Sequence, residues 1–203
     1  DSKSKPNAQT HTSSGIDFAQ AFAVAGFDVI LTDVAEKALQ QALATISGSL
    51  DRLIKKEKAT VEQKTAALAR IAVGTDLGLL RDCGLIIEAA TENEAVKCKL
   101  FAQLDEIAQP QTILASNTST LSITRLAAAT KRPAQVIGMH FFNPVPMMAL
   151  VEVTSGLQTS AATCEEIESI ARQLGKTPVK LKNSPGFVVN RLLVPMINEA
   201  IFT

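Results

Sequence analysis

His140 is the side chain of this sequence best suited to acid–base chemistry, because it stands near the end of an apolar run that starts at Val136. An imidazole titrates near neutral pH, so it can accept a proton from a reacting group such as a hydroxyl. Glu152 follows twelve residues later, and a strand, a turn and a returning strand would bring it back beside His140 to orient the ring and stabilise imidazolium. An isolated pair of this kind is more simply interpreted as a hydrogen-bonded strand-end histidine and an exposed glutamate.

Asp33 is a candidate for cofactor binding, because it ends the β-branched run 27–33 and lies eighteen residues after Gly15. This spacing fits an acid that bonds the adenosine ribose hydroxyls of NAD, where the extra phosphate of NADP would be repelled. The same spacing fits an N-cap of the following helix equally well.

The segment before Asp33 departs from the G-x-G-x-x-G turn that normally precedes such an acid. The glycines of that turn let the backbone approach a pyrophosphate at a helix N-terminus. Here the aligned positions read Thr10-His11-Thr12-Ser13-Ser14-Gly15, so only the third glycine is present. Residues 5–9 are polar and contain a proline, which argues against a central strand. Taken alone, this segment is not a dinucleotide fingerprint.

Apolar runs of strand length alternate with helix-length segments along most of the chain. Strands that are apolar throughout, separated by helices, indicate a mainly parallel sheet covered on both faces. We therefore expect an α/β fold of the doubly wound, Rossmann type. Strands are expected at residues 27–33, 85–89, 112–115, 136–141, 150–153 and 179–181, and helices at 18–25, 35–58, 61–70 and 187–202.

The residues Asn183-Ser184-Pro185-Gly186 are a turn signal that divides the chain. The helix expected after them is apolar on most sides and therefore needs packing partners. We expect residues 1–183 to form a dinucleotide-binding domain. Residues 184–203 should begin a second, all-helical domain, most of which is absent from this truncated chain.

Composition excludes several classes of function. Twenty basic and twenty acidic residues cancel to zero net charge, and Trp and Tyr are absent. Nucleic acid and anionic membranes both favour a basic surplus, so neither is an expected partner. No apolar run is long enough to span a bilayer or to serve as a signal peptide, so we expect a soluble, cytoplasmic protein. The three cysteines are widely spaced and lack histidines at ligand spacing, so neither a disulfide framework nor a metal site is expected.

Four sequence blocks, in their order and spacing, are highly specific. They are Ser116-Asn117-Thr118-Ser119, Met139-His140-Phe141-Phe142-Asn143-Pro144-Val145-Pro146, Val151-Glu152-Val153 and Pro185-Gly186-Phe187-Val188-Val189-Asn190-Arg191. With these blocks the chain resembles the NAD-dependent 3-hydroxyacyl-CoA dehydrogenases of β-oxidation, a family that includes 3-hydroxybutyryl-CoA dehydrogenase. The resemblance extends from Gly15 to Thr203.

The resemblance implies roles for individual residues. His140 is the general base, Glu152 orients it, Ser119 bonds the substrate oxygen, and Asn190 completes the site from the second domain. Positions matching cofactor contacts are Gly15, Asp33, Glu92, Lys97 and Asn117, and positions matching acyl-CoA contacts are Ser49, Lys56, Ser119 and Asn190. Without the resemblance, Ser119 is interpreted as a cap for a helix starting near Leu121, and Asn190 as an ordinary early-helix residue. Without the resemblance, Glu92 and Lys97 are interpreted as solvent-exposed residues at the start of a helix. Lys56 is likewise interpreted as part of a solvent-exposed, lysine-rich face.

The function implied is oxidation of an L-3-hydroxyacyl-CoA to the 3-ketoacyl-CoA by hydride transfer to NAD, in β-oxidation or short-chain hydroxybutyryl-CoA metabolism. The implied assembly is a homodimer formed through the helical second domain. One alternative is a cofactor-impaired homologue that binds acyl-CoA or a protein partner without turnover, which the missing glycines favour unless the sequence is in error there. Another is a different NAD-linked hydroxyacid dehydrogenase, which would leave the block around His140 unexplained.

Overall fold

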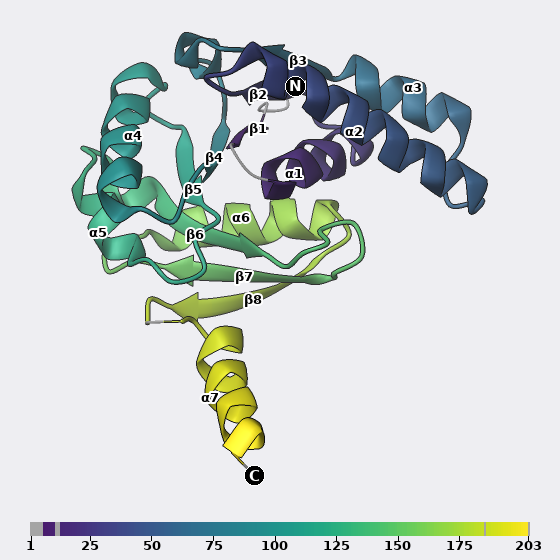
Figure 1. Cartoon of the computed structure of the whole chain (residues 1–203). Coiled ribbons are helices and arrows are strands. Elements are labelled where there is room, and N and C mark those ends of the chain that lie inside the picture. The colour runs from purple at the N-terminus through teal and green to yellow at the C-terminus, as the bar shows by residue number, and fades with distance from the viewer. Residues whose placement is uncertain (1–5, 11–12, 185, 203) are drawn as a thin grey trace.

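A computed structural model describes residues 6–10, 13–184 and 186–202 of the chain. The described residues contain one eight-stranded sheet, whose strand order is β3-β2-β1-β4-β5-β6-β7-β8 (Figure 1). The strands are β1 (Pro6–Thr10), β2 (Val29–Thr32), β3 (Ile71–Gly74), β4 (Leu85–Ala89), β5 (Ile113–Ser116), β6 (Val136–Phe141), β7 (Leu150–Ser155) and β8 (Thr177–Lys182). Neighbours are parallel except β6 and β7, which are antiparallel. The expected mainly parallel, doubly wound α/β fold is confirmed.

Helices cover both faces of the sheet. They are α1 (Ser13–Val24), α2 (Glu36–Lys55), α3 (Val61–Ala69), α4 (Glu94–Ile107), α5 (Ile123–Ala128), α6 (Ala161–Gln173) and α7 (Val189–Phe202), with 3₁₀ turns at Leu77–Leu80 and Pro133–Gln135. One core contains Phe18 of α1, Ile46 of α2 and Ile167 of α6. The core on the opposite face contains Phe101 of α4 and Leu126 of α5. In Figure 1, α1 to α3 accordingly lie at the upper right and α4 and α5 at the left.

The central strands are buried along their whole length. Every residue of β4, β5 and β6 is buried. Leu85 and Ile87 of β4 enter the core on the α1 side, whereas Ile86 between them enters the core on the α4 side. A strand covered on both faces must be largely apolar, which is why these three strands are recognisable in the sequence.

The expectation that the polar segment before Gly15 is not a central strand is wrong. β1 pairs in parallel with both β2 and β4, which makes it one of the innermost strands. Its proline, Pro6, is the first residue of the strand, a position where the missing N–H is tolerated. The backbone hydrogen bonds to strands on both sides hold β1 in the sheet, although its residues have a low strand propensity.

Other elements also differ from the expectation, among them β3 and α2. The short strand β3 follows α3 directly and pairs only with β2, so this four-residue edge strand carried too little pattern to be recognised. The helix expected over residues 35–58 ends at Lys55, because Lys56 is its C-cap and Glu57 has a φ of 56°. Lys56 therefore lies just beyond α2 and not within it.

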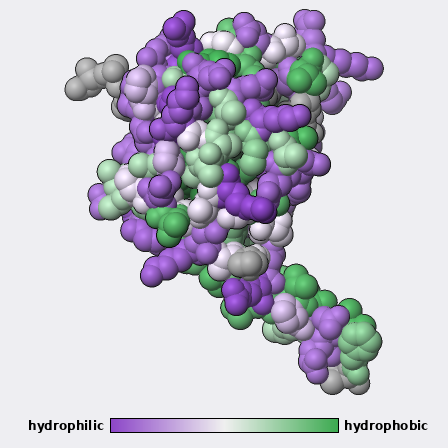
Figure 2. Space-filling view, turned by 90° about the vertical axis from the view of Figure 1, so that its left-hand side faces the viewer, coloured by the Kyte–Doolittle hydropathy of each residue, from purple (hydrophilic) through white to green (hydrophobic). Residues whose placement is uncertain are grey.

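Helix α7 extends away from the sheet beyond β8 (Figure 1). None of its described side chains is buried, and its apolar side chains are visible on the projecting helix in Figure 2. Leu192, Ile201 and Phe202 are 69%, 73% and 80% exposed. Phe187, just before the helix, is by contrast fully packed in the core on the α4 side. Among the described residues, no helix has both the length and the apolar character needed to cross a membrane.

Candidate active site

The carboxyl ends of the parallel strands β1, β2, β4, β5 and β6 meet at one edge of the sheet. From β1 the chain progresses outward to β2 and β3 in one direction, whereas β4, β5 and β6 follow in the other. Ligands of doubly wound sheets bind in the crevice at such a reversal of strand order. The side chains that follow these strand ends therefore form the candidate site.

His140 and Glu152 form a hydrogen-bonded pair at this edge. They are directly opposite each other in the antiparallel register of β6 and β7. Nδ1 of His140 lies 2.8 Å from Oε2 of Glu152, and both side chains are buried. The predicted return of Glu152 to His140 is confirmed, and the alternative of an exposed glutamate is wrong. Because Nδ1 faces the carboxylate, Nε2 is the ring nitrogen left for a reacting group.

The same glutamate also holds the start of α7. Its other oxygen, Oε1, accepts the N–H groups of Val188 and Val189 at 3.2 and 3.0 Å. The ring of Phe187 lies edge-on to His140, with ring centroids 5.9 Å apart. Asn190 follows Val189 in the first turn of α7 and is half-buried. The first turn of α7 is thus joined to the His140–Glu152 pair, which brings Asn190 to the same end of the molecule.

Asn117 and Ser119 follow β5, next to β6. The Oδ1 atom of Asn117 accepts the N–H of Phe141 at 2.9 Å, so Asn117 lies beside the residue that follows His140. Ser119 donates its N–H and its hydroxyl to Oε1 of Glu92, at 2.8 and 3.0 Å. Ser119 is not a helix cap: α5 begins at Ile123, and its cap is Ser122.

Lys97 is not on a solvated helix start. Its ammonium lies 2.5 Å from Oε2 of Glu88, and these two side chains are only 2% and 0% exposed. Ser116 donates to the same oxygen, and the N–H of Ala90 donates to the other oxygen of Glu88. The sequence analysis did not single out Glu88, which lies within the expected strand 85–89. A carboxylate inside an otherwise apolar run was the available signal, since a buried charge requires a partner.

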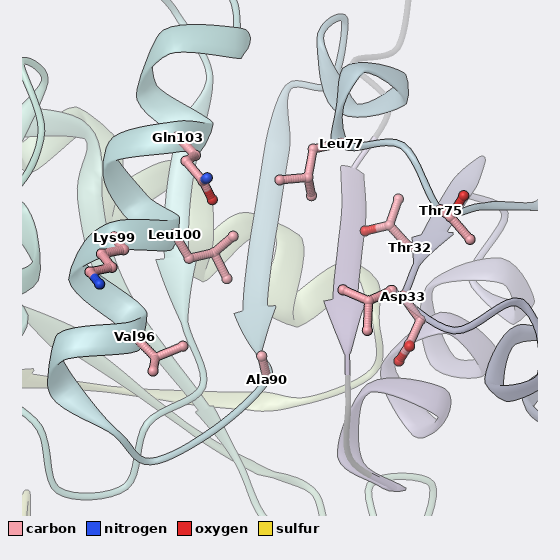
Figure 3. A pocket seen from close by; sticks show the side chains of 10 residues that line it. Thr32, Asp33, Thr75, Leu77, Ala90, Val96, Lys99, Leu100 and Gln103 are labelled. Carbon is pink, nitrogen blue, oxygen red and sulfur yellow. The ribbon is translucent and has the colours of Figure 1, made fainter.

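Asp33 lines a pocket of about 340 Å³ between the ends of β2 and β4 and helix α4. Figure 3 shows Val96, Leu100 and neighbouring side chains of α4 facing the end of β2 across this pocket. The alternative that Asp33 is the N-cap of α2 is wrong, because the N-cap is Ala35, whose N–H bonds Oδ1 of Asp33 at 2.8 Å. Thr32 beside it has a buried hydroxyl without a hydrogen-bond partner within the described part of the chain.

These features fit the adenosine portion of a dinucleotide. The pocket walls are largely apolar and suit a flat base, and the buried carboxylate of Asp33 lines the same pocket, where it could meet the ribose hydroxyls. Because the Thr32 hydroxyl has no hydrogen-bond partner among the described residues, a ligand could satisfy it. Gly15 is buried in the first turn of α1, which follows β1. His11 and Thr12, which occupy the remaining positions of the altered glycine turn, lie outside the described residues.

Ser49 and Lys56 lie apart from this group. Ser49 is a half-buried residue of α2, and Lys56 is exposed at the end of that helix. Helix α2 packs against α1 and α3, on the side of the sheet opposite α4. The structure therefore does not bring these two residues into the cluster around His140.

The loop after β6 is held by two residues that sequence reasoning missed. Lys176 donates its ammonium to the carbonyl oxygens of Val145 and Met148 at 2.5 and 2.8 Å. Burial lowers the pKa of Lys176. On the other side, burial raises the pKa of Asp17 in α1 above its usual 3.8, and a hydrogen bond from the Val145 N–H offsets part of that rise. The Val145 peptide is thus bound at both its N–H and its carbonyl group.

The described residues contain no cluster of His, Cys, Asp and Glu side chains that could hold a metal ion. Cys83 and Cys164 are buried, and Cys98 is half-buried; none of the three forms a disulfide.

Comparison with known proteins identifies the family. The model of the NAD-binding domain of 3-hydroxyacyl-CoA dehydrogenase matches residues 14–184. The chain is 49% identical over 189 residues to the 3-hydroxybutyryl-CoA dehydrogenase of Bradyrhizobium diazoefficiens, covering 93% of this chain and 64% of that protein. It is 44% identical over 193 residues to human mitochondrial hydroxyacyl-coenzyme A dehydrogenase, covering 92% of this chain and 62% of that protein.

A solved structure is similar over nearly the whole chain. It is that of (S)-3-hydroxybutyryl-CoA dehydrogenase from Ralstonia eutropha, with a TM-score of 0.94 and 51% sequence identity, covering 98% of this chain and 70% of that one. The chain thus spans somewhat less than two thirds of the length of the two relatives compared by sequence.

Proposed function

The chain belongs to the 3-hydroxyacyl-CoA dehydrogenase family, and from that premise we propose that the protein oxidises an L-3-hydroxyacyl-CoA to the 3-ketoacyl-CoA with NAD as the hydride acceptor. The observation that carries this proposal is the buried His140–Glu152 pair at the carboxyl edge of the sheet. An imidazole that presents its second nitrogen to the substrate is the group this reaction needs, because the alcohol proton must leave as hydride departs from the same carbon.

His140 acts as the general base through Nε2. Glu152 accepts the Nδ1 hydrogen, which holds the ring in one tautomer and stabilises the imidazolium once the substrate proton has arrived. Glu152 keeps its orientation because its second oxygen is bound by the N–H groups of Val188 and Val189. The ring of Phe187 packs edge-on against the imidazole, and His140 is only 8% exposed, so water has little access to it.

Ser119 and Asn190 position the substrate. Ser119 meets the substrate oxygen from the loop after β5, and Asn190 approaches from the first turn of α7. Asn117 forms a wall of the nicotinamide site, a role supported by its bond to the Phe141 N–H beside His140. Holding the reacting carbon against the cofactor in this way removes much of the entropic cost of the reaction.

NAD, when bound, supplies the carbon that accepts the hydride. Asp33 would bond the adenosine ribose, and Gly15 would allow close approach at the start of α1. Glu92 and Lys97 belong to the wall of the cofactor site. Lys97 acts through its ion pair with Glu88, which holds the start of α4 in place.

The remaining features concern the whole protein. Residues 1–183 are proposed as the dinucleotide-binding domain, and residues 184–203 as the first part of a helical second domain that forms a homodimer. The exposed apolar side chains of α7 support this division, because such a helix needs partners. Ser49 and Lys56 are proposed to contact the CoA moiety. The protein is proposed to act in the cytoplasm, in β-oxidation or hydroxybutyryl-CoA metabolism.

Turnover by the purified full-length protein tests the function. We expect NADH formation from L-3-hydroxybutyryl-CoA and NAD, and none from free 3-hydroxybutyrate or from 2-hydroxy acids. Oxidation of a free acid but not of the CoA ester would support another hydroxyacid dehydrogenase. Tight binding of the CoA ester without turnover would instead support a cofactor-impaired homologue.

A further inference from the structure

The carboxylate of Glu92 joins two loops at the carboxyl edge of the sheet. Glu92 lies between β4 and α4, and its three hydrogen-bond donors come from the loop after β5. Thr118 donates its hydroxyl to Oε2 at 2.8 Å. Ser119 donates its backbone N–H and its hydroxyl to Oε1, at 2.8 and 3.0 Å. One exposed glutamate thus receives both polar hydrogens of the residue proposed to meet the substrate oxygen.

This contact determines the direction of the Ser119 hydroxyl. A serine hydroxyl has one hydrogen and otherwise rotates to suit its surroundings. With that hydrogen on Oε1 of Glu92, and with the backbone N–H on the same oxygen, both the main chain and the side chain of Ser119 are oriented by one atom. The hydroxyl oxygen is therefore kept in one place before substrate arrives.

The turn after β5 also has hydrogen bonds of its own. Thr118 accepts the N–H groups of Thr120 and Leu121 on its hydroxyl oxygen, at 3.3 and 3.0 Å. Its own N–H bonds the hydroxyl of Ser116. None of these bonds involves the loop between β4 and α4. Glu92 in that loop adds a bond from the Thr118 hydroxyl and the orientation of Ser119.

Glu92 is itself well placed for this role, because the segments on both sides of it are held firmly. Glu88, four residues earlier, and Lys97, five residues later, form the buried ion pair that joins β4 to α4. Asn93, next to Glu92, caps α4 by accepting the Val96 N–H at 3.1 Å.

We propose that Glu92 is a positioning residue of the reaction, which orients the Ser119 hydroxyl for the substrate oxygen. When that oxygen binds, it takes the hydroxyl hydrogen from Oε1, while the Ser119 N–H stays on Glu92 and keeps the backbone in place. The proposal rests on the proposed function, because it takes Ser119 to be the group that meets the substrate.

A double-mutant cycle on the full-length protein tests this role. Glu92→Ala is expected to lower kcat for L-3-hydroxybutyryl-CoA about tenfold, because a misplaced catalytic contact is costly. Glu92→Gln keeps an acceptor oxygen at the same distance and should retain most of the activity. In a Ser119→Ala background, Glu92→Ala should have no further effect, since the two residues act as one unit. Effects that multiply, or a Glu92→Gln variant as impaired as Glu92→Ala, would overturn the proposal.

Amide hydrogen exchange provides a measurement that does not depend on turnover. In Glu92→Ala, the Ser119 amide should exchange faster, because its acceptor is lost. Glu94→Ala is the matched control, since Glu94 begins the same helix but pairs with exposed Arg125; Ser119 exchange should not change there. An unchanged Ser119 amide in Glu92→Ala contradicts the positioning role. A parent protein that shows the expected exchange but no turnover contradicts the proposed function instead.

Discussion

Glu88 and Lys97 form an ion pair in the interior, with Nζ of Lys97 2.5 Å from Oε2 of Glu88 and neither side chain more than 2% exposed. The pair connects β4 to α4, and Ser116 adds β5 by donating to the same carboxylate oxygen. Three of the elements that form the candidate site are therefore fixed to each other by one carboxylate.

Removal of one member of this pair should destabilise the protein strongly. Lys97→Met leaves the Glu88 carboxylate buried without its counter-charge, which typically costs about 3–5 kcal/mol of unfolding free energy. The measurement is denaturant-induced unfolding at neutral pH. The double variant Glu88→Gln/Lys97→Met buries no charge and should recover part of the loss. A single variant as stable as the parent would show that water or another group replaces the lysine.

Loss of the general base should affect chemistry and not cofactor binding. His140→Gln is expected to lower kcat by about two to four orders of magnitude, the usual scale of a lost acid–base catalyst. Titration with NADH should show a nearly unchanged Kd, which separates the loss from a disturbed fold. If His140→Gln kept a kcat close to that of the parent, His140 would not be the general base.

Asp33 should select NAD over NADP. A carboxylate beside the adenosine ribose repels the extra phosphate of NADP, so Asp33→Ala should lower the ratio of kcat/KM for NAD to that for NADP by about tenfold or more. The ratio is measured with both cofactors on the parent and the variant. A ratio that does not change would leave Asp33 as a residue that only orders the turn before α2.

Asp17 should make stability depend on pH. Burial raises its pKa above the usual 3.8, so the folded state binds the proton more tightly than the unfolded state does. The resulting stabilisation is fully present below pH 3.8, the usual pKa of this carboxyl. It is lost as the pH rises through the pKa of Asp17 in the folded state. Asp17→Asn keeps an acceptor for the Val145 N–H without the charge, and should raise Tm at neutral pH.

The pH profile provides the control for this prediction. The gain in Tm from Asp17→Asn should shrink as pH falls toward 3.8, where the parent carboxyl is itself protonated. Asp51→Asn is the matched variant, because Asp51 is an exposed partner of Lys64 and should give no such gain. If the gain in Tm from Asp17→Asn did not depend on pH, the cause would be packing and not the charge of Asp17.

The features that the sequence alone determined are those with a local pattern. The strands β4, β5 and β6 are buried on both faces, so most of their residues had to be apolar and each strand could be recognised by itself. The pairing of His140 with Glu152 was also predictable, since a hairpin-like return of an antiparallel strand joins residues close in sequence.

The tertiary structure decided which distant residues meet. β1 is central because β2 and β4 pair with it on both sides, which outweighs its polar sequence. The contact of Glu92 with Ser119 depends on β4 and β5 being neighbours, and that of Lys97 with Glu88 depends on how α4 packs on β4. No local pattern encodes such contacts, because they arise from strand order and helix packing. The sequence contained the carboxylates, and only the folded sheet determined their partners.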